Sequence, residues 1–185
     1  MPEPPSSVCP VALAGHLDSR IRRWLQNPRR LLAPYVREGM TVLDFGCGPG
    51  FFTLEFARLV GPSGRVLAVD LQPEMLELLR LKAHGTELAA RITLHPCQPN
   101  RLGVAEPLDF VLAFYVLHEL PDPRAFLAEL RPLFTPGGQL LIVEPPLHVS
   151  KAAFAVTLRV ATEAGFRVVA RPRILFNHVA LLAPG

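Results

Sequence analysis

The fold is decided by the stretch Thr41-Val42-Leu43-Asp44-Phe45-Gly46-Cys47-Gly48-Pro49-Gly50. An apolar, β-branched run leads to an acid at Asp44, and three glycines then follow at alternate positions. Residues 51–60 continue with the apolar spacing of a helix. This order predicts a strand, a tight glycine turn and a helix, and the other segments can be placed relative to that unit.

Further helices and strands are predicted on both sides of the unit. The predicted strands are 41–45, 65–70, 91–95, 108–114, 139–143, 166–170 and 178–182. The predicted helices are 17–25, 27–35, 51–60, 73–84, 124–134 and 150–164, with N-caps at Asn27, Asp122 and Ser150. The proline-rich and glycine-rich residues 96–107 are predicted to be a loop. Strands that alternate with helices and are apolar on both faces indicate a parallel sheet that is covered on both sides.

The last two strands have no helix between them, so they predict a hairpin with one antiparallel strand at or beside the edge of the sheet. The predicted fold class is therefore α/β, a Rossmann-like three-layer sandwich. Its sheet is expected to have seven strands, mostly parallel, with one antiparallel strand near the C-terminus. We expect residues 36–185 to form a single domain, preceded by a tail and helices over residues 1–35 that could act as a lid.

Composition limits the class of protein. The chain has 185 residues, 50% of them hydrophobic and 19% charged, which is typical of a globular protein. Its apolar runs are shorter than the roughly 18 to 20 residues that a bilayer span needs, and its start lacks the pattern of a signal peptide. A cytoplasmic protein without a membrane span is expected.

Two other site classes receive little support from the sequence. Cys9, Cys47 and Cys97 are widely spaced and form no Cys-x-x-Cys motif, so no metal site is predicted. The net charge is +3, and arginines are frequent between Arg20 and Arg37. Because no Gly-rich arginine tract accompanies them, we interpret these arginines as a solvated helix face, and a nucleic-acid partner is not expected.

The acids Asp44, Asp70 and Glu144 fall at the ends of predicted parallel strands, where ligands of open α/β sheets bind. A dinucleotide site requires Gly-x-Gly-x-x-Gly, but Phe51 stands where the third glycine would be. A carboxylate beside the turn suits a cationic group better than phosphates. The spacing favours S-adenosylmethionine over NAD, with a tight turn that needs glycine only for its geometry as the alternative.

Several ordered motifs carry a resemblance to a known family. They are residues 42–50, Val66-Leu67-Ala68-Val69-Asp70, Leu108-Asp109-Phe110-Val111 and Pro136-Gly137-Gly138. Together they resemble the motif set of class I S-adenosylmethionine-dependent methyltransferases. The chain is most similar to the small-molecule group that includes quinone-biosynthesis C-methyltransferases and arsenite methyltransferases. The resemblance implies S-adenosylmethionine as cofactor and a small-molecule methyl acceptor.

The resemblance also implies which residues bind the cofactor. They are Asp44, Gly46, Cys47, Gly48, Asp70, Leu71, Cys97, Gln98 and Phe114. Asp44 and the turn would hold the methionine end, Asp70 the ribose, and Leu71 would pack on the adenine. The family often has an acid after the third strand, where this chain has Pro96-Cys97-Gln98, so Gln98 or a backbone carbonyl would serve instead. Phe114 and Tyr115 would close over the cofactor.

His118 and Tyr115 are the candidate catalytic residues. Histidine titrates near physiological pH, so His118 could accept a proton from a hydroxyl or amine. The alternative is that His118 and Glu119 only hydrogen-bond their loop or cap the next helix. Glu144 and His148 form a second candidate pair. A further hypothesis places the thiols of Cys9 and Cys97 together in the crevice to bind a metalloid such as arsenite.

The leading hypothesis for function is a small-molecule methyltransferase, with a homodimer as one way to complete the pocket. A catalytically silent cofactor-binding or scaffold subunit is the alternative from a different class. An RNA or protein methyltransferase is the third hypothesis. Base-modifying members carry an Asn/Asp-Pro-Pro-Tyr motif after strand four, where this chain has Ala113-Phe114-Tyr115-Val116.

Overall fold

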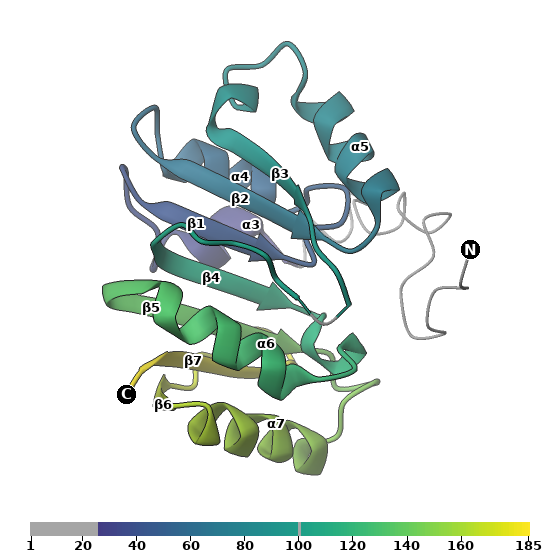
Figure 1. Ribbon diagram of the computed structural model, residues 1–185, viewed down its shortest axis with the longest axis vertical. Coiled ribbons are helices and arrows are strands. Elements are labelled where there is room, and N and C mark those ends of the chain that lie inside the picture. Colours follow the sequence, from purple (N-terminus) through teal and green to yellow (C-terminus); the bar gives the residue numbers. More distant parts are fainter. Residues whose placement is uncertain (1–25, 100) are drawn as a thin grey trace.

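The computed structural model describes residues 26–99 and 101–185. Its centre is one sheet in the order β3-β2-β1-β4-β5-β7-β6 (Figure 1). The strands are β1 (Thr41–Phe45), β2 (Arg65–Asp70), β3 (Ile92–Pro96), β4 (Leu108–Phe114), β5 (Phe134–Glu144), β6 (Phe166–Ala170) and β7 (His178–Pro184). The α-helices are α3 (Pro28–Leu32), α4 (Thr53–Leu59), α5 (Pro73–Ala83), α6 (Pro123–Leu130) and α7 (Lys151–Glu163). Short 3₁₀ helices are η2 (Ala89–Arg91), η3 (Leu117–Glu119) and η4 (Arg131–Leu133).

The strand pairing confirms the predicted fold class. The ladders β3-β2, β2-β1, β1-β4 and β4-β5 are all parallel, whereas β7 pairs antiparallel with both β5 and β6. The closing hairpin therefore places its antiparallel strand beside the edge rather than at it. The strand order reverses between β1 and β4, and this is where open α/β sheets bind their ligands.

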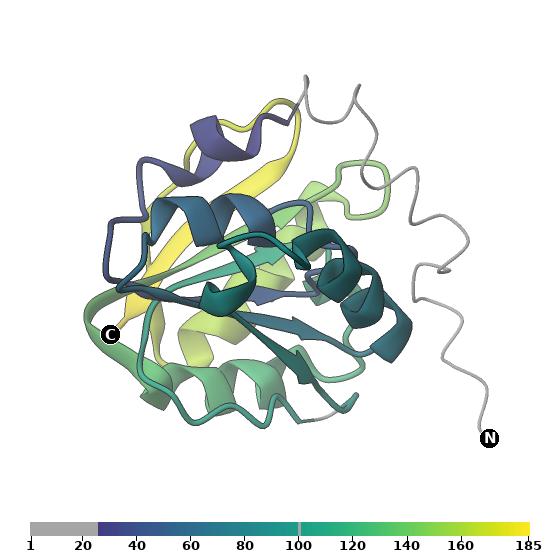
Figure 2. The same ribbon diagram turned by 90° about the horizontal axis from the view of Figure 1, so that it is seen from above.

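Helices cover both faces of the sheet, with α3 and α4 on one side and α6 and α7 on the other (Figure 2). The alternation of side chains along each strand explains this arrangement. Val42 and Val66 pack with Phe56 of α4 in one buried cluster. Their sequence neighbours Leu43 and Leu67 point to the opposite face. Two apolar faces on one sheet need two layers of helices.

A loop replaces the helix that would join β3 to β4, as residues 96–107 predicted. Leu102 and Val104 of this loop are buried, with 2% and 8% exposure, against the face that carries α6. Glu129 of α6 fixes the loop, because its carboxylate accepts hydrogen bonds from Leu102 N and Gly103 N, both at 2.8 Å. Two apolar side chains of the loop thus cover this face of the sheet. The Glu129 carboxylate of α6 holds the loop in place, and we call this contact the Glu129 clamp.

The largest differences from the predicted boundaries lie in two neighbouring elements, a helix and the strand that follows it. The helix expected over residues 124–134 ends at Leu130 and continues only as the 3₁₀ turn η4. Pro132 explains this end, because proline has no N–H for a helical hydrogen bond and its ring clashes with the preceding turn. The following strand begins at Phe134 rather than at residue 139. The Phe134 ring packs edge-on against Phe166, with 5.8 Å between ring centroids.

The N-terminal part of the described chain belongs to the core. Leu32 of α3 is fully buried, and the Tyr35 ring stacks on Phe110 with centroids 5.5 Å apart. Asn27 caps α3 through a hydrogen bond from Arg30 N to its side chain, as predicted. The predicted helix over residues 17–25 and Cys9 lie outside the described residues. Within the described ranges, no helix has the length and apolar character required to cross a bilayer.

Candidate functional site

The glycine turn after β1 is held against the end of β2. Gly46 N and Cys47 N both donate hydrogen bonds to Val69 O, at 2.9 and 3.0 Å. Gly46 has a φ of +68°, and a Cβ at this position would lie 2.6 Å from Cγ2 of Val116. Only glycine meets both conditions, so the turn comes to lie directly beneath the segment that follows β4.

Two strand-end carboxylates are held by groups from other parts of the chain. Asp44 is 2% exposed and accepts a 2.6 Å hydrogen bond from the Thr53 hydroxyl of α4. Asp70 accepts hydrogen bonds from Gly48 N at 2.8 Å and Gln72 N at 2.9 Å. Burial raises the pKa of Asp70, and these backbone N–H groups oppose that rise. Asp70 therefore joins the glycine turn to the end of β2.

A pocket lies where the ends of β1, β2, β3 and β4 meet. All the residues assigned to cofactor binding from the sequence line it, namely Asp44, Gly46, Cys47, Gly48, Asp70, Leu71, Cys97, Gln98 and Phe114. Tyr115 and Glu119 also line it, whereas His118 does not. The charged side chains lining it are all acids: Asp44, Asp70 and Glu119. Among the described residues, the pocket wall therefore carries negative charge only.

Tyr115 joins the pocket to two distant segments. Its backbone has a φ of +61°, which is uncommon for a residue with a side chain. The Tyr115 hydroxyl accepts a hydrogen bond from Gln26 Nε2 at 2.9 Å and donates one to Asn177 Oδ1 at 2.7 Å. The ring also packs on Phe114, with centroids 4.3 Å apart. The residue thus connects the N-terminal segment, the pocket and the approach to β7.

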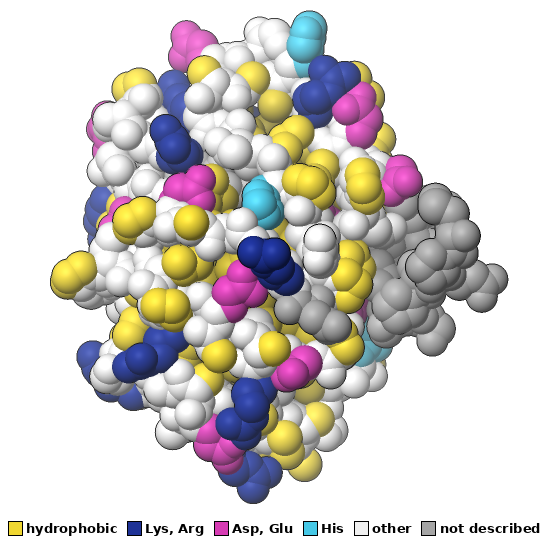
Figure 3. Space-filling view, in the orientation of Figure 1, with side chains coloured by type: hydrophobic (Ala, Val, Ile, Leu, Met, Phe, Trp, Pro, Cys, Tyr) yellow, Lys and Arg dark blue, Asp and Glu magenta, His cyan; other side chains and the backbone are white. Residues whose placement is uncertain are grey.

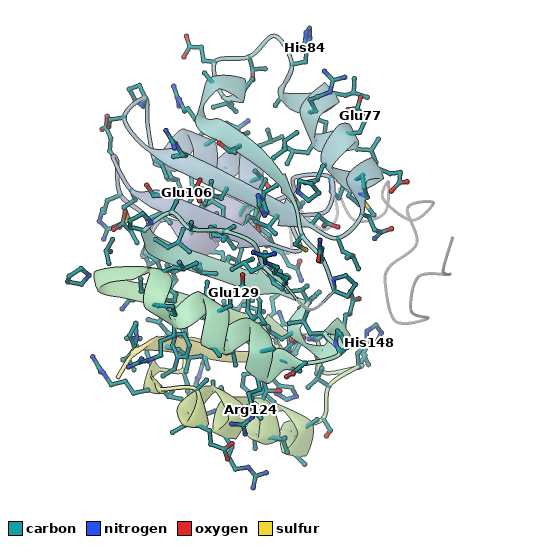
Figure 4. All side chains as sticks on the ribbon, in the orientation of Figure 1. Glu77, His84, Glu106, Arg124, Glu129 and His148 are labelled. Atoms are coloured by element: carbon teal, nitrogen blue, oxygen red, sulfur yellow. The ribbon has the colours of Figure 1, made fainter. Side chains whose placement is uncertain are left out.

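The candidate histidines and acids pair differently from the sequence prediction. His118 and Glu119 were one predicted group and Glu144 and His148 another, but Nδ1 of His118 lies 2.6 Å from Oε2 of Glu144. His118 N also donates to Glu144 Oε1 at 3.2 Å. The hydrogen bond with Glu144 raises the pKa of His118, while partial burial opposes the rise. His148 lies beyond the end of β5 with its ring centroid 5.9 Å from that of His118 (Figure 4).

The described cysteines are free thiols. Burial raises the pKa of Cys47 well above its ordinary value, and it raises that of Cys97 to about 11. Both side chains are therefore neutral thiols at physiological pH, which is the form least suited to bind a metal or metalloid. The other cysteine of the arsenite hypothesis, Cys9, lies outside the described residues.

Three contributions to the site were missed in the sequence. Thr53 holds Asp44 from the first residue of α4, Glu144 holds His118 across the β4-β5 ladder, and Glu119 enters the pocket rather than capping a helix. The second depends on which strands are neighbours, which the order of residues along the chain does not reveal. A signal for Thr53 was present, because a hydroxyl at the start of the helix after a strand-end acid can reach back to that acid.

Comparison with known proteins identifies the family. The family model described as "Methyltransferase domain" matches residues 36–165. The chain belongs to this methyltransferase family. The resemblance to class I S-adenosylmethionine-dependent methyltransferases that the strand-end motifs predict is thereby confirmed. The match begins shortly before β1 and ends at the glycine after α7, so it includes every residue that lines the pocket.

Individual relatives of this methyltransferase agree with the family. It is 29% identical over 150 residues to the ubiquinone/menaquinone biosynthesis C-methyltransferase UbiE of Klebsiella pneumoniae, covering 78% of this chain and 59% of that protein. It is 33% identical over 137 residues to a ubiquinone biosynthesis O-methyltransferase of Xanthomonas euvesicatoria, covering 71% of this chain and 54% of that one. The chain thus spans little more than half the length of these curated relatives.

A solved structure matches over nearly the whole chain. It is that of a SAM-dependent methyltransferase from Aquifex aeolicus, with a TM-score of 0.83 and 27% sequence identity. The match covers 95% of this chain and 98% of the other. The described part of this methyltransferase therefore shares the fold of that protein.

Proposed function

We propose that this chain transfers a methyl group from S-adenosylmethionine to a small-molecule acceptor by in-line displacement. One observation carries the proposal: a single pocket at the carboxyl ends of the strands gathers every residue assigned to the cofactor, and its charged side chains are all acids. A ligand that carries a sulfonium and an ammonium group complements such a wall. The name of the matched structure supports this donor, and the name of the UbiE relative supports methyl transfer.

The residues present fit the cofactor. Gly48 lines the pocket with a φ of +51°, and no atom lies within 4 Å of the position that a Cβ would take. A ligand can therefore approach the backbone there. We assign Asp44 and the turn to the methionine end, Asp70 to the ribose hydroxyls and Leu71 to the adenine. The rest of the pocket wall is formed by Cys97, Gln98 and Phe114. We assign to Gln98 the role of the acid that the family often carries after the third strand.

When bound, S-adenosylmethionine supplies a methyl carbon attached to a cationic sulfur, which departs as a neutral thioether. The chain's contribution is mainly positional, since holding reactants in line and excluding water can be worth up to about 7 to 11 kcal/mol. We assign proton removal from the acceptor to His118. With Nδ1 directed at Glu144, Nε2 is left to accept a proton from a hydroxyl or amine. Tyr115 would position the acceptor at the mouth of the pocket.

The acceptor side is assigned to the N-terminal segment. We propose that residues 36–185 form the single catalytic domain and that residues 1–35 contribute a lid, a role that the Gln26 to Tyr115 hydrogen bond supports. Because Leu32 packs in the core, the lid would come mainly from the residues before α3. No substrate domain is inserted between the described strands, which favours a small acceptor. A homodimer and a cytoplasmic location complete the proposal.

Nucleic acid is not part of the proposal. On the face that carries α6 and α7, acidic and basic side chains are interspersed and form no basic stripe (Figure 3). Proteins that bind nucleic acids usually gather lysine and arginine along one face. The motif of base-modifying methyltransferases is also missing after β4, where the sequence is Ala113-Phe114-Tyr115-Val116.

Methyl transfer can be tested with isotope-labelled S-adenosylmethionine and a panel of quinols, phenols, amines and thiols. The proposal expects label in at least one acceptor and its loss in His118→Asn when the acceptor is a hydroxyl or amine. His84, which is exposed beyond α5, provides the matched control substitution His84→Asn. Tight cofactor binding with no transfer to any member of the panel would favour the silent cofactor-binding subunit instead.

A further inference from the structure

Glu119 is a pocket carboxylate whose side chain has no hydrogen-bond partner among the described residues. It ends the 3₁₀ helix η3 and lines the pocket together with Asp44 and Asp70. Among the residues that the structure describes, no donor is hydrogen-bonded to the Glu119 side chain, and only its backbone N–H is engaged, with Val116 O at 3.1 Å. The carboxylate therefore faces the space that a ligand would fill.

The other acids at this end of the sheet are hydrogen-bonded to groups of the protein itself. Asp44 is held by Thr53, and Asp70 by the backbone N–H groups of Gly48 and Gln72. Glu144 is held by His118. These bonds compensate most of the cost of burying a charge. The desolvation of the Glu119 carboxylate is not offset by such a hydrogen bond. A positive charge on the bound ligand would offset it.

The electrostatics of Glu119 point the same way. Burial, together with the charges of Asp70 and Glu144, raises the pKa of Glu119 to about 7, and the charge of His118 opposes this rise. A carboxylate in this environment gains more from a nearby positive charge than one in water, because the local dielectric constant is lower. A cationic ligand in the pocket would thus hold Glu119 in its ionised form.

We infer that Glu119 is a specificity-determining residue that favours the cationic methyl donor over its neutral thioether product. This inference rests on the proposed function. S-adenosylmethionine and S-adenosylhomocysteine share their adenosine, ammonium and carboxylate groups and differ by one methyl group and one positive charge. Val116 lies against Gly46 of the turn assigned to the methionine end, and Glu119 N donates a hydrogen bond to Val116 O, so Glu119 lines the pocket near that end. A carboxylate there distinguishes donor from product by charge, which weakens product retention after each turnover.

Calorimetry with three ligands tests the inference: S-adenosylmethionine, S-adenosylhomocysteine and sinefungin, which carries an ammonium near the sulfonium position. In Glu119→Gln we expect about tenfold weaker binding of the two cationic ligands and a change of less than about threefold for the neutral product. Glu106→Gln is the control. It removes the same charge from a side chain that does not line the pocket and that lies toward the opposite ends of the strands from His148 (Figure 4).

The pH dependence gives a second readout. Between pH 8 and pH 6 the wild-type preference for S-adenosylmethionine over the product should fall, because Glu119 becomes protonated near pH 7. In Glu119→Gln that slope should be absent, and any residual slope would report His118, whose pKa is also raised and whose charge acts on Glu119 in the wild type. Equal weakening of all three ligands, or a loss of turnover with unchanged binding, would overturn the inference. Failure of the wild type to bind any of them would instead overturn the proposed function.

Discussion

Nδ1 of His118 lies 2.6 Å from Oε2 of Glu144, a carboxylate that is only 1% exposed. The pair joins the loop after β4 to the end of β5, and it raises the pKa of His118 above the ordinary value of 6.5. In Glu144→Gln the charge is lost while the shape is kept, so the pKa of His118 should fall toward 6.5. Titration of the histidine ring protons by NMR measures this directly.

The same pair gives stability a pH dependence of defined sign. Since the folded-state pKa of His118 is raised, its contribution is fully present below the unfolded value of 6.5 and is lost as pH rises through the folded value. Glu144→Gln should therefore lower the free energy of unfolding more at pH 5.5 than at pH 9. An equal loss at both pH values would show that the pair has no electrostatic role.

Gly46→Ala tests the contact between the turn and Val116. The new Cβ would lie 2.6 Å from Val116 Cγ2 and take a φ of +68°. We expect a loss of about 2 to 4 kcal/mol in unfolding free energy, from backbone strain plus overpacking. Gly85→Ala is the control, because its φ is +73° but no atom lies within 4 Å of the new Cβ. Urea denaturation should show a larger loss for Gly46→Ala, and Val116→Ala should restore part of it.

Glu129→Ala tests the Glu129 clamp, which holds the loop that joins β3 to β4. Removing the carboxylate takes away the acceptor of the 2.8 Å hydrogen bonds that Leu102 N and Gly103 N donate. We expect a loss of about 1 to 3 kcal/mol in unfolding free energy. Glu106→Ala in the same loop removes a single 3.2 Å bond to Ala105 N and should cost less. Equal losses in the two variants would show that the clamp does not hold the loop.

Deletion of residues 1–25 tests the lid. The deletion keeps α3, because Leu32 is fully buried and its removal would open the core. Affinity for S-adenosylmethionine should stay within about tenfold of the wild type, while methyl transfer should be lost. Thermal unfolding confirms that the shortened chain is folded. Full activity after the deletion would refute the lid, and Gln26→Ala alone should cause a partial loss if the Tyr115 bond positions the segment.

Most of the fold follows from local sequence signals. The alternation of strands and helices, the breaks at glycine and proline, and the caps at Asn27, Asp122 and Ser150 are visible in the sequence and are confirmed. The failure at residues 124–134 also has a local cause, since Pro132 stops a helix that apolar spacing alone would continue. The strand that then begins at Phe134 was not predicted, because its pairing with Leu108 depends on a distant partner.

The pocket was more predictable than the candidate catalytic group. Cofactor positions lie within a few residues of strand ends, and parallel strands bring those ends together whatever the details of packing. The partner of His118 could not be found in this way. Glu144 is 26 residues away along the chain and becomes its neighbour only because β4 and β5 are adjacent. Glu119 was misjudged for a similar reason, since the direction of a side chain on a 3₁₀ turn is set by the turn's surroundings.

Calorimetric titration of the full chain with S-adenosylmethionine is the most direct test of the account, carried out on the wild type and on Asp70→Ala. The wild type should bind one molecule per chain. Asp70→Ala should bind at least about tenfold more weakly, because it loses the proposed ribose acceptor and the bond that fixes Gly48 N. Absence of binding by the wild type, or equal affinity in both proteins, would contradict the assignment of the pocket to the methyl donor.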